Sequence, residues 1–136
     1  MQISPYLNFN GQCSEAFKFY EKCLGGRIEM MHTYGESPMK DQVPAEARNR
    51  VMHVHLNVGN QTLFGSDSPT PEPNPPHGFH VSIAVDSEAD GQRVFRELSA
   101  GGQVVMPFEK TFWSPGFGML VDRFGIPWMV NVNHKG

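Results

Sequence analysis

The stretch at residues 51–58 reads VMHVHLNV and places two histidines two residues apart within an apolar run. If this run is a strand, its side chains alternate between two faces, and His53, His55 and Asn57 then share one face. Two imidazoles about 7 Å apart on one face can share a metal ion with a third donor, or can line a pocket as hydrogen-bonding groups. The stretch thus leaves two chemistries open, metal binding and polar recognition of a small molecule.

A second group of candidates lies at residues 103–113, where QVVMPFEKTFW is expected to form a strand. On that strand Glu109, Thr111 and Trp113 would share one face. Trp113 could stack on a flat ligand, or pack in the core or in a dimer interface, and both readings stay open. Glu109 could act as a base or an anchor, but a solvated surface charge is the interpretation we favour.

The elements that must position these residues follow from hydrophobic periodicity. Residues 14–24 show a helical stripe, with Ser14 as the expected N-cap and Gly25 as the stop. The stripe consists of Ala16, Phe19, Tyr20, Cys23 and Leu24. Strands are expected at 4–9, 27–34, 51–58 and 62–67, and a long loop at 35–50.

The second half of the chain repeats this order. Residues 68–77 contain five prolines and predict a stiff linker. A strand at 79–85 is followed by a helix capped by Asp86 or Ser87, whose stripe is Gly91, Val94, Phe95 and Leu98. Further strands are expected at 103–113, 117–122 and 126–132, the last two joined by a tight turn at Gly125. The order β-α-β-β-β occurs twice, which predicts an α+β fold.

Strand alternation gives four of these strands one apolar face and one mixed face. The mixed faces carry His, Asn, Tyr, Ser and Met and almost no Lys, Arg or Glu. A solvent-facing sheet would normally carry such charges, so we expect these faces to line a cavity of moderate polarity. The predicted ligand-binding residues are Tyr6, Asn8, His53, His55, His80, Trp113 and Asn131.

The segments PYLNFNG, FKFYEKCLGG, FHVSIAVD and TFWSPGFGMLVDRFGIPWMVNV together resemble the PhnB-like branch of the glyoxalase/bleomycin-resistance/extradiol-dioxygenase superfamily, the vicinal oxygen chelate fold. The resemblance covers nearly the whole chain and implies a single glyoxalase-like domain over residues 1–136. It implies two βαβββ modules, about 1–67 and 78–134, whose mixed curled sheets form a cup with the helices on the convex side. It also implies a homodimer.

The same resemblance bears on metal binding. Metalloenzymes of the superfamily place one His or Glu ligand on the first and last strand of each module. Those positions hold Ser4, Phe64, His80 and Met129 in this sequence, so only His80 retains a strong donor. We therefore expect no cofactor and no metal, while a divalent metal held by His80 with His53 and His55 stays possible.

Composition narrows the setting. The formal charge of −3 gives no basic field for nucleic acid, and no apolar run is long enough for a membrane span. Cys13 and Cys23 would be ~15 Å apart on one helix, too far for a disulfide, which favours a reduced, cytoplasmic protein with two inert thiols. The sequence also lacks a G-x-G-x-x-G motif after a strand and a P-loop.

Two functions remain. The first is a small-molecule binding or sequestering protein of the bleomycin-resistance type, with an unidentified ligand. The alternative is a divalent-metal-dependent lyase, isomerase or dioxygenase with non-standard ligands. The missing donors favour the first, and the three histidines keep the second open.

Overall fold

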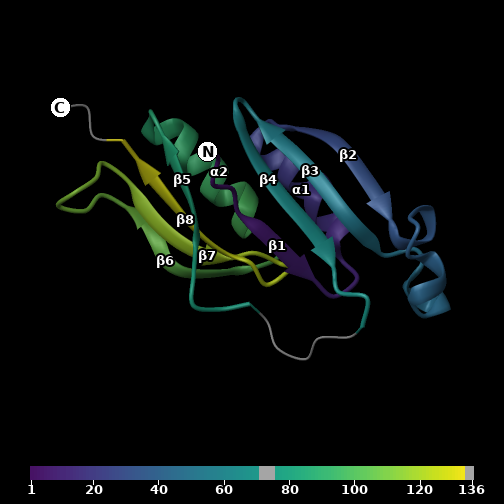
Figure 1. Ribbon diagram of the computed structural model, residues 1–136. Coiled ribbons are helices and arrows are strands. Elements are labelled where there is room, and N and C mark those ends of the chain that lie inside the picture. The colour runs from purple at the N-terminus through teal and green to yellow at the C-terminus, as the bar shows by residue number, and fades with distance from the viewer. Residues whose placement is uncertain (71–75, 134–136) are drawn as a thin grey trace. The chain divides into compact units, whose positions relative to one another are not determined.

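The computed structural model describes residues 1–70 and 76–133, and the chain divides into two compact units, Met1–Asn74 and Pro75–Gly136. Each unit holds one four-stranded sheet with one helix packed on it (Figure 1). Residues 71–75 of the expected proline-rich linker lie outside the described residues.

In the first unit the chain order is strand, helix and three strands. The elements are β1 (Tyr6–Phe9), α1 (Cys13–Leu24), β2 (Arg27–Thr33), β3 (Val51–Val58) and β4 (Gln61–Asp67). The strand order is β1-β4-β3-β2, with β1 parallel to β4 and the other neighbours antiparallel. The expected loop at 35–50 contains short 3₁₀ turns at Tyr34–Glu36, Lys40–Gln42 and Ala45–Ala47.

The second unit has the same topology. Its elements are β5 (Val81–Val85), α2 (Glu88–Ser99), β6 (Gln103–Glu109), β7 (Phe117–Val121) and β8 (Pro127–Val132). The strand order β5-β8-β7-β6 and the parallel β5–β8 pair match the first unit position by position. The α+β class and the duplicated βαβββ module are confirmed.

Helix α2 begins and packs as predicted. Ser87 is the N-cap, and its hydroxyl accepts a hydrogen bond from the Asp90 amide at 3.1 Å. The buried residues of the helix are Gly91, Val94, Phe95 and Leu98, the predicted stripe. The tight turn between β7 and β8 is also confirmed, with Gly125 at φ 89°.

Helix α1 corrects two predictions. It begins at Cys13 rather than after Ser14, because the carboxylate of Asp67 accepts hydrogen bonds from the Gly11 and Cys13 amides at 2.8 and 3.0 Å. Its buried face is also rotated. Phe17 is fully buried, whereas Phe19, which was assigned to the core stripe, is half-buried.

The buried ring of Phe17 explains this rotation. A side chain at Gly65 on β4 would overlap that ring, so the sheet leaves room for a phenyl group there. The core of the unit then forms between α1 and the sheet face that carries Leu7, Val54 and Leu56.

Strand β6 is shorter than predicted. It ends at Glu109, and residues 111–114 form a turn in which the Thr111 hydroxyl accepts from the Trp113 and Ser114 amides at 3.3 and 3.1 Å. This local side-chain bond competes with strand pairing. The prediction that Glu109, Thr111 and Trp113 share one face of a strand was therefore wrong, because Thr111 and Trp113 both lie in the turn after the strand.

Candidate functional site

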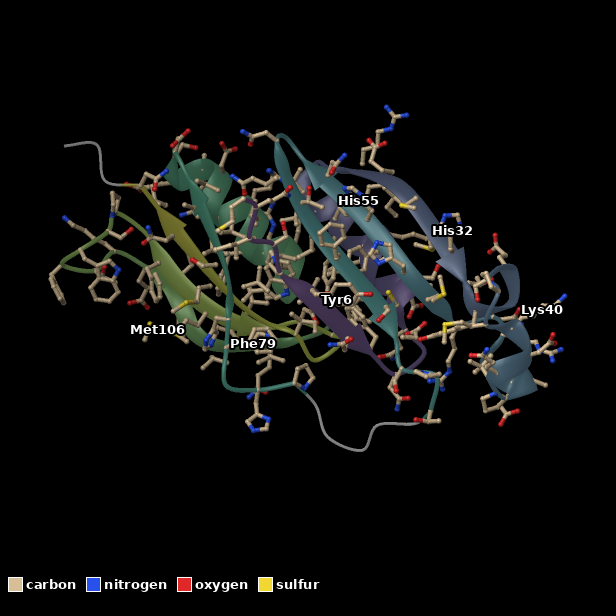
Figure 2. The ribbon with its side chains drawn as sticks, viewed as in Figure 1. Tyr6, His32, Lys40, His55, Phe79 and Met106 are labelled. Carbon is tan, nitrogen blue, oxygen red and sulfur yellow. The ribbon has the colours of Figure 1, made fainter. Side chains whose placement is uncertain are left out.

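His53 and His55 lie on the side of the first sheet that α1 does not cover. Val54 and Leu56 are fully buried against the helix, so His53, His55 and Asn57 point to the opposite side. We call this side of the first sheet its open face. Figure 2 shows Tyr6 of β1 and His55 of β3 there.

Strand register assembles a cluster of rings on this open face. Tyr6 of β1 pairs with Phe64 of β4, and Phe64 pairs with His55 of β3. The centroid of the Phe64 ring lies 6.2 Å from that of Tyr6, 5.4 Å from that of His53 and 5.0 Å from that of His55. Four rings from three neighbouring strands are thus in contact, and we call them the ring cluster.

Polar contacts fix the orientation of these side chains. The hydroxyl oxygen of Tyr6 lies 3.3 Å from Nδ1 of His53. Nε2 of His55 lies 2.8 Å from Oδ1 of Asn57, which also accepts a bond from the Thr62 hydroxyl at 3.3 Å. The cluster is therefore held in place by its own hydrogen bonds.

A further predicted residue, Asn8, lies beside the cluster. It shares the open face with Tyr6, two residues earlier on β1. Its Oδ1 is 3.5 Å from the hydroxyl of Ser66 on the neighbouring strand, so this corner of the face presents uncharged hydrogen-bonding groups.

The second sheet also has a side that its helix leaves uncovered. Asn131 of β8 lies there, paired with Phe117 of β7 and Ala84 of β5. Its Oδ1 is buried, and within the described residues it has no hydrogen-bond partner. A buried acceptor left unpaired costs about 1–3 kcal/mol, which a ligand's N–H or O–H group could recover.

Two other predicted ligand-binding residues, Trp113 and His80, lie in more exposed places. Trp113 is about half exposed, and its ring meets the edge-on rings of Phe112 and Phe117 at 4.8 and 5.3 Å. His80 is exposed and precedes the first residue of β5, whereas the sequence placed it within the strand. His80 belongs to the second unit and lies outside its sheet, whereas His53 and His55 both lie on β3 of the first, so strand register relates only the latter two.

The metal positions implied by the superfamily do not fit a metal. Phe64 uses its ring to pack in the cluster, and Met129 lies opposite Ser82 and Met119, neither of which is a strong ligand. Among the described residues, no group of three or more His, Cys, Asp or Glu side chains is placed to hold an ion.

Sequence reasoning missed two members of the open face. Phe64 was considered only as a metal position, although it is the central ring of the cluster. His32 was not considered, although it lies directly opposite His53 in the β2–β3 register. Alternation along residues 62–67 assigns Phe64 to this face. It would have assigned His32 to the helix side together with Ile28, and only the bulge between Ile28 and Met30 turns His32 to the open face.

The buried titratable groups serve the fold. Burial, with a smaller contribution from the charge of Asp67, raises the pKa of the Cys13 thiol far above its ordinary value. Burial also raises the pKa of Tyr34, whose hydroxyl donates to the Asp67 carbonyl at 2.8 Å. Both thiols are buried, which is typical of structural cysteines.

A family model of the glyoxalase/bleomycin resistance protein/dioxygenase superfamily matches residues 2–130. The chain belongs to this superfamily. The match spans both βαβββ units, in agreement with the resemblance found in the sequence.

Individual relatives agree with this assignment. The chain is 32% identical to protein YjdN of Escherichia coli, over 97% of this chain and 95% of YjdN. It is 45% identical to protein PA1353 from Pseudomonas aeruginosa, with a TM-score of 0.89 and 98% of both chains covered.

A more distant structure supports the fold alone. It is a PhnB protein from Bacillus cereus, described as a putative 3-demethylubiquinone-9 3-methyltransferase, and it is 22% identical with a TM-score of 0.83. The alignment covers 98% of this chain and all of that one.

None of the helices in the described residues is long and apolar enough to cross a membrane.

Proposed function

We propose that this protein binds and sequesters a small molecule on the open faces of its sheets, without transforming it. The observation that carries this proposal is the composition of the open face of the first sheet. In β1, β3 and β4, the strand positions on that face carry aromatic rings, imidazoles, amides and hydroxyls, but no Lys, Arg, Asp or Glu.

This composition differs from that of an ordinary solvent-facing sheet, which is rich in charge. The two cysteine thiols, which are potential nucleophiles, lie in the core and not on this face. Fixed rings and uncharged polar groups are typical of a binding surface.

The test is a thermal-shift and calorimetric screen of the purified protein against soluble small molecules, including bleomycin. We expect at least one stoichiometric ligand that mass spectrometry recovers unchanged after incubation. His55→Ala should weaken its binding, because His55 contacts both Phe64 and Asn57. Chemical conversion of the ligand would refute the proposal.

The alternative, a metal-dependent lyase, isomerase or dioxygenase, is tested independently. Calorimetric titration with Zn²⁺, Ni²⁺ and Mn²⁺ compares the wild type with His80→Ala. Weak binding that is the same in both proteins would agree with sequestration. Submicromolar, near-stoichiometric binding that His80→Ala abolishes would favour the enzyme.

We propose further that the two modules act as one glyoxalase-like domain in a cytoplasmic homodimer, with neither nucleic acid nor membrane as a partner. The edge strand β6 exposes Val104, Val105 and Met106, and an exposed apolar edge is commonly covered by another chain. Light scattering should give about twice the 15.2 kDa chain mass at micromolar concentration. A 15.2 kDa particle would refute the dimer.

A further inference from the structure

Three rings of the cluster lie nearly parallel to one another. The planes of Tyr6 and Phe64 differ by 24°, those of His53 and Phe64 by 27°, and those of Tyr6 and His53 by 31°. Their centroids are 5.4 to 6.2 Å apart, which is the range of offset-stacked aromatic pairs. The three centroids form a triangle, in which Phe64 is stacked with both Tyr6 and His53 while Tyr6 and His53 are tilted to each other. A further planar ring could extend this stack at its exposed ring, Tyr6.

The stack is open to a ligand and is ordered before one binds. Tyr6 is 46% exposed, although its ring contacts two others. Its hydroxyl contacts Nδ1 of His53 and its ring packs beside Phe64, so both contacts restrain the orientation of the Tyr6 ring. A surface that is ordered beforehand loses less conformational entropy on binding.

The positions of charged residues around the ring cluster indicate whether its ligand is charged. Two charged residues of the first sheet, Arg27 and Glu29, could reach its open face. Both lie at the start of the edge strand β2, where Glu29 sits in the bulge after Ile28. The Tyr6–Phe64 pair lies on β1 and β4, on the far side of β3 from β2. On β1, β3 and β4 the open-face positions offer a charged ligand no opposite charge to offset its loss of hydration.

We propose that the ring cluster is the stacking subsite for an uncharged, planar aromatic ligand. This inference rests on the proposed function and adds the chemical class of the ligand. A planar ring would be recognised by offset stacking on Tyr6 and Phe64. Its polar substituents would meet the hydroxyl and amide groups beside them, such as Asn8.

The experiment uses three probes with a shared skeleton: 2-naphthol, its saturated analogue decahydro-2-naphthol, and the anion 2-naphthoate. Each is titrated into the full ¹⁵N-labelled chain, and backbone amide shifts locate the binding. We expect 2-naphthol to shift amides of β1, β4 and β3 near Tyr6 and Phe64. The saturated analogue should bind there at least about fivefold more weakly, because it cannot stack.

Variants separate stacking from hydrophobic contact. Tyr6→Leu should weaken 2-naphthol binding by roughly 5- to 100-fold, the range for loss of one ring stack, and leave decahydro-2-naphthol unchanged. Tyr6→Phe keeps the ring and should retain most of the affinity. Phe112→Leu, at a ring that is 97% exposed in the second unit, is the matched control and should change nothing on the first sheet.

Each contrary outcome has a defined meaning. If the saturated analogue binds this face as tightly as 2-naphthol, the face binds small molecules but the aromatic class is wrong. If 2-naphthoate binds tighter than 2-naphthol, the ligand is anionic and the inference fails. If none of the probes shifts the first sheet, the stacking subsite is refuted, while the ligand screen still decides the proposed function.

Discussion

Asp67 ties three parts of the first unit together through one buried carboxylate. The side chain is at the end of β4 and is only 1% exposed. Oδ1 accepts from the Gly11 and Cys13 amides at the start of α1, and Oδ2 accepts from the Val51 amide of β3 at 2.9 Å. We expect Asp67→Asn to destabilise the protein strongly, although it removes only one charge and no volume.

The magnitude follows from the donors. An Asn side chain keeps one oxygen, so in either orientation its NH₂ group faces at least one backbone N–H and loses that bond. A charge-assisted bond is worth about 1.5–3 kcal/mol, and the negative charge at a helix N-terminus adds about 0.3–1 kcal/mol. A neutral amide is cheaper to bury than a carboxylate, which offsets part of the loss. The net cost should be about 3 kcal/mol.

Urea denaturation followed by far-UV circular dichroism measures this cost as a lower midpoint at unchanged slope. The matched control is Asp41→Asn, an exposed carboxylate 3.9 Å from Arg48, which should change stability by less than about 0.5 kcal/mol. If Asp67→Asn changes the free energy of unfolding no more than Asp41→Asn does, the hydrogen-bond reasoning is wrong.

Three further predictions concern the core. Gly65→Ala should cost about 1–3 kcal/mol by overpacking against the Phe17 ring, measured by urea denaturation; unchanged stability would mean that the ring can move aside. Above about pH 9 the unfolded state releases the Cys13 proton, and above about pH 10 that of Tyr34, while the folded state keeps both because its pKa values are raised. The free energy of unfolding should then fall as the pH rises, by up to about 1.4 kcal/mol per pH unit from Cys13 and with a contribution of the same sign from Tyr34. A flat profile from pH 9 to 11 would contradict this. Cys13 and Cys23 should both resist Ellman's reagent in the native protein and react fully in urea, whereas fast native labelling would show that α1 opens.

Much of the fold could be predicted from the sequence, because it depends on local patterns. Helix α2 has its own cap at Ser87 and an unambiguous stripe, and both predictions were confirmed. Strand alternation likewise assigned His53 and Leu56 to opposite faces of β3. A pattern that repeats within one element needs no knowledge of its partners.

The errors arose where a distant or competing group decides the local structure. The start of α1 depends on Asp67, which lies 54 residues after Cys13, so inspection of residues 12–15 alone could not find it. In FKF, two phenylalanines compete for the core, and only the gap at Gly65 selects Phe17. The end of β6 was missed because the Thr111 hydroxyl forms a turn inside an otherwise strand-like sequence.

The candidate site was predictable as a face but not as a set of contacts. Alternation identified Tyr6, His53 and His55, but the stack depends on Phe64, which joins them only through the β1–β4–β3 register. The β3–β4 register is set by a short local turn, but the pairing of β1 with β4 joins strands far apart in the sequence and is a tertiary property.

The repeat explains why the ring cluster belongs to one unit. The parallel pair Tyr6–Phe64 in the first sheet corresponds to Ser82–Met129 in the second, since β1–β4 and β5–β8 share the same topology. The two units thus share a backbone topology but carry different side chains at these open-face positions. A binding mode that relies on one equivalent donor from each module has no support in these pairs. It follows that 2-naphthol should shift amides around Tyr6 without a matching set around Ser82.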